Sequence, residues 1–124
     1  MRNTGWDSAE ISDLVGKTIS DIKGAKEGDD VISICCSDGS KYRMLHYDDC
    51  CESVYVEDIC GDVEDLIGSP VVKAEETTNS GEEGYGSYTW TFYHIFTIKG
   101  GICIRWYGSS NGYYSERVDF EVAV

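Results

Sequence analysis

The feature that most constrains the fold is a strict alternation of side chains over residues 87–99. Successive residues of a β-strand point to opposite faces of a sheet, so this run predicts a strand with two different faces. Gly100-Gly101 and Asn111-Gly112 are turn signals, and they divide residues 87–122 into a predicted three-stranded antiparallel meander. One face of the first strand carries Tyr88, Trp90, Phe92, His94, Phe96 and Ile98, and the other carries Thr89, Thr91, Tyr93, Ile95 and Thr97.

Earlier segments also predict strands. An Asp38-Gly39 turn joins predicted strands over residues 31–36 and 41–46. Residues 53–59 alternate, with Val54 and Val56 expected on the buried face, and residues 71–77 form a further predicted strand. Residues 79–86 hold three glycines and show no periodic signal, so this stretch is expected to be a flexible loop.

Two short segments have the signatures of helices. Asp7 followed by Glu10 has the form of a helix capping box. Asp62 is the expected N-cap of a second helix over residues 62–67. The sequence therefore predicts one α+β domain over residues 1–124. Its mainly antiparallel sheet or sandwich would have about six or seven strands, accompanied by two short helices.

The chain is strongly acidic, with 23 Asp and Glu residues against 10 Lys and Arg residues and a formal net charge of −13. Proteins bind nucleic-acid phosphates through Lys and Arg, so this charge argues against nucleic acid as a direct partner. It favours either simple solubility or docking onto a basic protein surface. No apolar run approaches the roughly 20 residues of a membrane span, and residues 1–7 lack the apolar core of a secretory signal.

Two vicinal pairs, Cys35-Cys36 and Cys50-Cys51, account for four of the six cysteines. Without a secretory signal this spacing is not typical of a disulfide framework, and neighbouring cysteines seldom bridge each other. The thiols are therefore expected to be free, buried or bound to metal. Cys36 is predicted to be a core thiol and Cys103 a half-buried one.

Residues 46–52, His-Tyr-Asp-Asp-Cys-Cys-Glu, concentrate one imidazole, two thiols and three carboxylates. Zinc takes donors of these three kinds, usually four in a tetrahedron. We predict that His46, Cys50 and Cys51 bind a structural zinc ion and that Asp49 supplies an oxygen. The alternative is that a cysteine of the pair is a buried apolar residue and that the carboxylates face water. Other candidates for the fourth ligand are Cys36, Asp58 and Cys60.

The chain lacks the spacings of common zinc modules and metal enzymes, which are paired C-x-x-C, H-E-x-x-H, and H-x-E followed by P-C-x-x-C. His94, the second histidine, lies among aromatic residues and is interpreted as a hydrogen-bonded core residue rather than a ligand. No carboxylate forms a recognised pair with a nucleophile, and no glycine-rich phosphate loop is present. A non-catalytic protein is therefore expected.

The acidic residues gather in two groups, one around the predicted zinc site and one flanking residues 79–86. A metal ion would neutralise part of the first group, and the remaining negative charge would compete for a groove built to hold nucleic acid. The residues expected to contact a basic partner are Glu57, Asp58, Asp62, Glu64, Asp65, Glu75, Glu76, Glu82 and Glu83.

Several motifs resemble those of a family of small phage and prophage proteins of unassigned function. The first is His46-x-x-Asp49-Cys50-Cys51-Glu52, followed by Asp58-x-x-Gly61-Asp62-x-x-Asp65-Leu66. The others are Tyr88-Thr-Trp-Thr-Phe-Tyr, Ile104-Arg-Trp-Tyr-Gly and Ser110-Asn-Gly-Tyr-Tyr-Ser-Glu, so the resemblance spans about residues 11–120. The chain is similar to the zinc-containing type II-A anti-CRISPR proteins, which act on Cas9.

This resemblance implies a phage-encoded, non-enzymatic inhibitor in the cytoplasm of a bacterial host, with a structural zinc ion. Its partner would be Cas9, a strongly basic protein with nucleic-acid channels. An acidic inhibitor would dock on the recognition lobe or the DNA channel and stop the loading of target DNA. The alternatives are a metal-dependent enzyme of phage origin and an accessory structural phage protein.

Overall fold

The computed structural model describes residues 5–124, and nine β-strands account for most of them. The expectation of no secretory signal concerns residues 1–7, of which residues 1–4 lie outside the described range. The elements in chain order, with η for a turn of 3-10 helix, are β1 (Trp6–Ser8), η1 (Ile11–Leu14), β2 (Ile19–Lys23), β3 (Val31–Cys36), β4 (Lys41–Leu45), β5 (Ser53–Cys60), η2 (Val63–Leu66), β6 (Val71–Glu83), β7 (Gly86–Thr97), β8 (Gly100–Ser110) and β9 (Asp119–Ala123).

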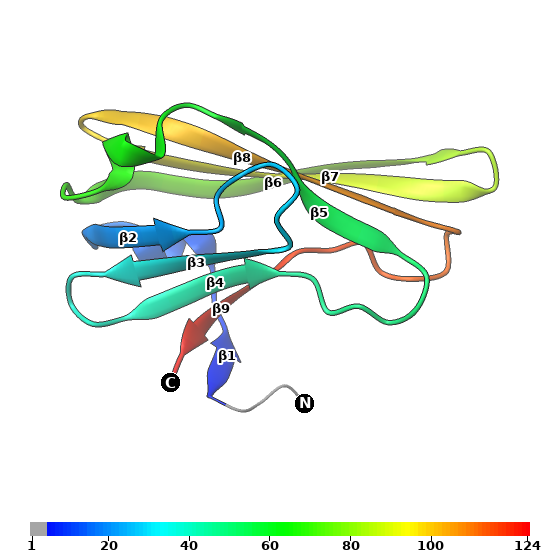
Figure 1. Cartoon of the computed structure of the whole chain (residues 1–124), viewed down its shortest axis with the longest axis horizontal. Helices are drawn as coiled ribbons and strands as arrows, with labels where there is room; N and C mark the ends of the chain where they lie inside the picture. Colours follow the sequence, from blue (N-terminus) through cyan, green and yellow to red (C-terminus); the bar gives the residue numbers. More distant parts are fainter. Residues whose placement is uncertain (1–4) are drawn as a thin grey trace.

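The strands form two antiparallel sheets that lie one over the other (Figure 1). The five-stranded sheet has the order β1-β9-β4-β3-β2, and the four-stranded sheet has the order β5-β8-β7-β6. The β6–β7 hairpin projects well beyond the five-stranded sheet, as Figure 1 shows. The outer face of the four-stranded sheet, turned away from the other sheet, is called the outer sheet face below.

One hydrophobic core joins the two sheets, and alternate residues of the strands point into it. Trp106 of β8 and Tyr93 of β7 are its largest fully buried side chains. Burying a large apolar side chain completely stabilises a fold by about 1.5–3 kcal/mol. Other inward-facing residues of the strands are Ile32, Ile34, Tyr42, Met44, Val54, Val56, Ile102 and Ile104.

The prediction of an α+β fold with two short helices is wrong, because the described residues form two β-sheets and only two single turns of 3-10 helix. Asp7 does not cap a helix, since it lies in β1 and pairs with Val122. Asp62 does cap η2, where its carboxylate accepts the backbone N–H of Glu64 at 3.0 Å. Each turn is followed directly by a residue with extended backbone, Val15 after η1 and Ile67 after η2, so neither turn continues into a longer helix.

The C-terminal part of the chain also differs from its prediction. The hairpin between β7 and β8 is confirmed, but the third strand of the predicted meander, β9, crosses to the other sheet and pairs with β4 and β1. Val118 and Phe120 are buried in the core, and the Phe120 ring stacks on Tyr42 with centroids 5.3 Å apart. Burial between the sheets therefore outweighs continuation of the local hairpin pattern.

Residues 79–86, expected to be a flexible loop, lie in strands except for Gly84 and Tyr85, which form the hairpin turn. β6 continues to Glu83, and its pairing with β7 runs without a break from Lys73 to the hairpin turn. The turn itself contains Gly84 at φ 62°, a left-handed conformation that glycine adopts without strain. The glycines and polar residues of this stretch reflect an exposed hairpin rather than an unpaired loop.

The alternation over β7 is confirmed, and the face that packs against the other sheet is the one without the aromatic series of Tyr88, Trp90, Phe92 and Phe96. The buried residues are Thr91, Tyr93, Ile95 and Thr97. The aromatic series, His94 included, lies half-exposed on the outer sheet face. The interpretation of His94 as a core histidine is therefore wrong, and its ring stacks against Phe92 with centroids 6.3 Å apart.

A buried histidine–glutamate pair as the candidate functional site

His46 follows the end of β4, where the chain leaves the five-stranded sheet. Its side chain is only 3% exposed. Both ring nitrogens have close oxygen neighbours, since Nδ1 lies 2.7 Å from the carbonyl oxygen of Arg117 and Nε2 lies 2.7 Å from Oε2 of Glu52. The imidazole therefore joins the loop after β4 to the segment before β9.

Glu52 precedes β5 and its side chain is fully buried. Its carboxylate accepts the backbone N–H groups of Asp49 at 2.8 Å and Cys50 at 3.0 Å. The Cys50 N–H and the His46 ring together lower the pKa of Glu52 to about 2, so the group is ionised at neutral pH. A carboxylate and a carbonyl can only accept hydrogen bonds, so both ring nitrogens of His46 face acceptors.

Cys50 and Cys51 are joined to each other by a disulfide. The expectation that neighbouring cysteines remain unbridged is therefore wrong for this pair. Both residues are exposed and lie in the turn whose backbone the Glu52 carboxylate holds. In the bridged form neither sulfur is a thiolate, which is the form of cysteine that binds metal.

The structure assembles a different set of possible metal donors from the predicted one. Among the described residues, His46, Asp48 and Glu52 can each offer one atom, and these atoms lie within 4.8 Å of one another. Nε2 of His46 is 3.9 Å from Oδ1 of Asp48. Asp49, predicted to supply an oxygen, instead donates its backbone N–H to Glu52.

The other candidates for a fourth ligand do not join this group. Cys60 lies at the opposite end of β5 from Glu52, and its Sγ is 3.9 Å from a carboxylate oxygen of Asp58. Asp58 also pairs with Arg105 at 3.3 Å. Cys36 is 5% exposed in the core, as the sequence predicted, and Cys103 is half-buried, also as predicted.

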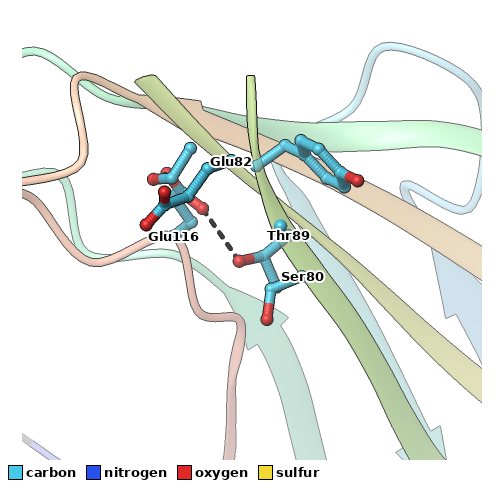
Figure 2. Close-up of a pocket in the computed structure, with 7 residues that line it drawn as sticks. Ser80, Glu82, Thr89 and Glu116 are labelled. Atoms are coloured by element: carbon cyan, nitrogen blue, oxygen red, sulfur yellow. Dashed lines mark hydrogen bonds between the residues drawn. The ribbon is translucent and has the colours of Figure 1, made fainter. Parts of the chain in front are cut away.

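A second polar cluster surrounds Glu116, which is 7% exposed. Its carboxylate accepts hydroxyl hydrogen bonds from Ser87 at 2.6 Å, Ser110 at 2.6 Å and Thr89 at 2.8 Å. Figure 2 shows the Thr89 hydroxyl directed at this carboxylate. Burial would raise the pKa of Glu116, but the hydrogen bonds from the three hydroxyls outweigh it and the pKa is lowered.

The two clusters are adjacent, because the Arg117 carbonyl that binds His46 follows Glu116 directly in the chain. The His46 cluster connects the segment before β9 to the loop after β4, and the Glu116 cluster connects the same segment to strands β7 and β8. A surface pocket of about 300 Å³ opens beside Glu116, lined also by Ser80, Glu82 and Thr89 of the β6–β7 hairpin (Figure 2). Sequence reasoning missed Glu116, since only folding brings it to Ser87 and Thr89.

The acidic residues predicted to contact a partner do not form one patch. Asp62, Glu64 and Asp65 lie in or beside η2, near the first residue of β6, whereas Glu82 and Glu83 lie at the far tip of the β6–β7 hairpin. Of the remaining four residues, Glu57 and Asp58 pair with Arg105. Glu75 lies 3.8 Å from Lys73. Glu76 is close to the Tyr93 hydroxyl.

Fold and site together define an all-β protein of two antiparallel sheets, in which a buried histidine–glutamate pair connects the loop after β4 to the segment before β9. The chain belongs to a family described as a domain of unknown function (DUF7448), whose model matches residues 12–120. No curated protein and no solved structure gives a significant match to the chain. Within the described residues, no helix is long and apolar enough to cross a membrane.

Proposed function

We propose that this protein is a non-catalytic, acidic binding module that docks on a basic protein through its aromatic outer sheet face. The observation that carries the proposal is the net charge of −13, which draws cationic surfaces and repels nucleic acid. The partner implied by the sequence resemblance is Cas9, on its recognition lobe or DNA channel, and the proposed effect is to prevent loading of target DNA.

Internal pairing of the cations supports this proposal. Arg43 pairs with the buried Glu121 at 2.9 Å, Arg105 with Glu57 at 2.6 Å, and Lys17 with Asp38 at 2.6 Å. These basic side chains are therefore paired within the chain. The excess of carboxylates over basic residues then determines the negative surface charge that a partner protein encounters.

Exposed aromatic residues supply a second support. Trp90, Phe92 and Tyr107 lie half-exposed on the outer sheet face, and Phe96 is 37% exposed. Large aromatic side chains are enriched in protein interfaces, whereas a sheet that faces only water is normally polar. These exposed rings, with the Glu83 carboxylate beside Trp90 and Tyr107, support a docking role for this face.

The test is a DNA-cleavage assay with guide-loaded Cas9. Added before target DNA, an equimolar or greater amount of this protein is expected to block cleavage, and the complex is expected to weaken as salt rises. Added after the DNA has loaded, it is expected to leave cleavage largely intact. Unchanged cleavage when a molar excess of the protein is added before the target DNA contradicts the proposal.

A charge reversal locates the docking face. Glu83→Lys, at the edge of the outer sheet face, is expected to weaken inhibition about tenfold or more because a repulsive charge replaces an attractive one. Glu27→Lys makes the same change of charge at an exposed site in the β2–β3 connection and serves as the matched control. Equal losses from the two variants would indicate a nonspecific charge effect instead of a defined face.

A second candidate function is the binding of a divalent metal ion, favoured by the convergence of His46, Asp48 and Glu52. Zinc accepts imidazole and carboxylate donors together, and a metal ion there would replace the proton between His46 and Glu52. Zinc is expected to raise the unfolding midpoint of the wild-type protein.

The metal proposal is tested by zinc titration with elemental analysis. Asp48→Asn is expected to lower bound zinc at least about tenfold, since it removes one donor and its charge. Asp49→Asn, one residue away with an exposed side chain, is the control. Sub-stoichiometric zinc in the wild-type protein after dialysis at saturating metal would overturn this second proposal.

A further inference from the structure

The projecting part of the four-stranded sheet carries a small pocket on its outer face. The pocket has a volume of about 200 Å³ and is lined by Glu83, Tyr88, Trp90 and Tyr107. Three of these four residues are aromatic and the fourth is a carboxylate. That combination suits an organic cation, because ring faces are electron-rich and the carboxylate supplies the counter-charge.

The rings form walls at different angles. Trp90 and Tyr107 are register partners on β7 and β8, and their ring centroids lie 4.6 Å apart with a 54° angle between the planes. Tyr55 of β5 meets Tyr107 edge-on, with centroids 6.2 Å apart, and so supports it from the far side. Two inclined ring faces supported in this way can face one cation together.

Tyr88 provides a third wall across the neighbouring strand. Its register partner on β6 is Gly81. A Cβ placed on Gly81 would lie only 2.5 Å from the Tyr88 hydroxyl oxygen, so the ring occupies the space that a side chain would otherwise fill. The glycine thus permits the Tyr88 ring to lie over β6, the strand that ends at Glu83.

The outer sheet face already holds one cation by the same means. The Arg105 guanidinium lies 5.4 Å from the Trp90 ring centroid and is anchored by Glu57 at 2.6 Å and Asp58 at 3.3 Å. An aromatic ring and carboxylates therefore cooperate to bind a positive side chain next to the pocket. Within the pocket, Glu83 is the carboxylate that lines the same space as Trp90, Tyr88 and Tyr107.

We infer that this pocket binds an alkylammonium group, namely the side chain of a lysine presented by a basic partner. The inference rests on the proposed function for the nature of that partner, and it assigns the contact that the partner's lysine makes. The volume suits an ammonium head with a short part of its alkyl stem, whereas sites for drug-sized ligands are larger. The net charge of −13 favours the entry of cations.

The experiment follows the indole and tyrosine signals by NMR while Nα-acetyl-lysine methylamide is added at constant ionic strength. Saturable shifts are expected at Trp90, Tyr88 and Tyr107, with Trp90→Phe identifying the Trp90 indole signal. The Nε-acetylated probe, which has the same stem but no charge, is expected to bind at least about tenfold more weakly. Equal binding of the two probes, or shifts confined to Trp6 or Tyr113, would overturn the assignment.

Adjacent glutamates give a matched pair of variants. Glu83 lines the aromatic pocket, whereas Glu82 lines the pocket beside Glu116 on the opposite face of β6. Glu83→Gln is expected to weaken the lysine probe about tenfold and Glu82→Gln less than about twofold, although each removes one charge. Gly81→Ala is expected to weaken the probe without any change of charge, because it displaces Tyr88. Equal effects of the two Gln variants would refute the role of Glu83.

Failure of this inference and failure of the proposed function are distinguishable. If the lysine probe fills the pocket while wild-type protein leaves Cas9 cleavage unchanged, the pocket stands and Cas9 is the wrong partner. If Cas9 is inhibited equally by the wild type and Glu83→Gln, and the probe shifts nothing in the pocket, the docking function stands and the lysine site is refuted.

Discussion

Replacement of His46 with alanine is expected to lower the unfolding midpoint by about 10 °C, among the largest effects of any single substitution outside the apolar core. The variant leaves the buried Glu52 carboxylate without its imidazole partner and the Arg117 carbonyl without a donor. A buried charge stripped of its partner is costly, since the protein interior solvates it poorly. Thermal unfolding followed by circular dichroism measures the change.

His94→Ala is the matched control, because it removes the same side chain from a half-exposed position on the outer sheet face. We expect it to shift the midpoint by no more than about 2 °C. Comparable losses from the two variants would mean that the paired environment of His46 contributes nothing beyond the packing of a ring. In that event the histidine–glutamate pair would not stabilise the connection between the loop after β4 and the segment before β9.

Glu116→Ala is expected to reduce the free energy of unfolding by about 2–4 kcal/mol, because three hydroxyls lose a charged acceptor in a nearly buried site. The hydroxyls belong to Ser87, Thr89 and Ser110, so the loss should detach the segment before β9 from the β7–β8 hairpin. Urea unfolding measures the change. Glu82→Ala, on the exposed side of the same pocket, is expected to change stability by less than about 0.5 kcal/mol.

The same carboxylate also makes stability depend on pH. The folded pKa of Glu116 lies below its ordinary value of 4.5, so its contribution is fully present above that pH and is lost as the pH falls through the folded pKa. The Glu116→Gln variant is therefore expected to lose less stability than the wild type on acidification below about pH 4.5. Parallel stability curves for the two proteins over this range would contradict a lowered pKa.

The sequence determined the strands that form locally and where several of them turn. The Asp38-Gly39 hairpin, the inward-facing Val54 and Val56, and the β7–β8 hairpin all follow from period-two alternation and glycine turns. The sequence also identified residues 46–52 as the segment with concentrated polar chemistry. Within that segment it predicted thiolate ligands, whereas the structure shows a Cys50–Cys51 disulfide and gives the central role to Glu52.

Only the tertiary structure decided which face of each strand is buried and which distant residues meet. Alternation marks two faces of β7 but does not say which one another sheet will cover, and the covered face proved to be that of Tyr93 and Ile95. The aromatic face of β7 is therefore the outer one, and it carries the pocket that we propose binds lysine. The contacts of His46 with Arg117, and of Thr89 with Glu116, join residues 71 and 27 positions apart, respectively. Such contacts have no local signal, since they exist only once β9 has crossed between the sheets.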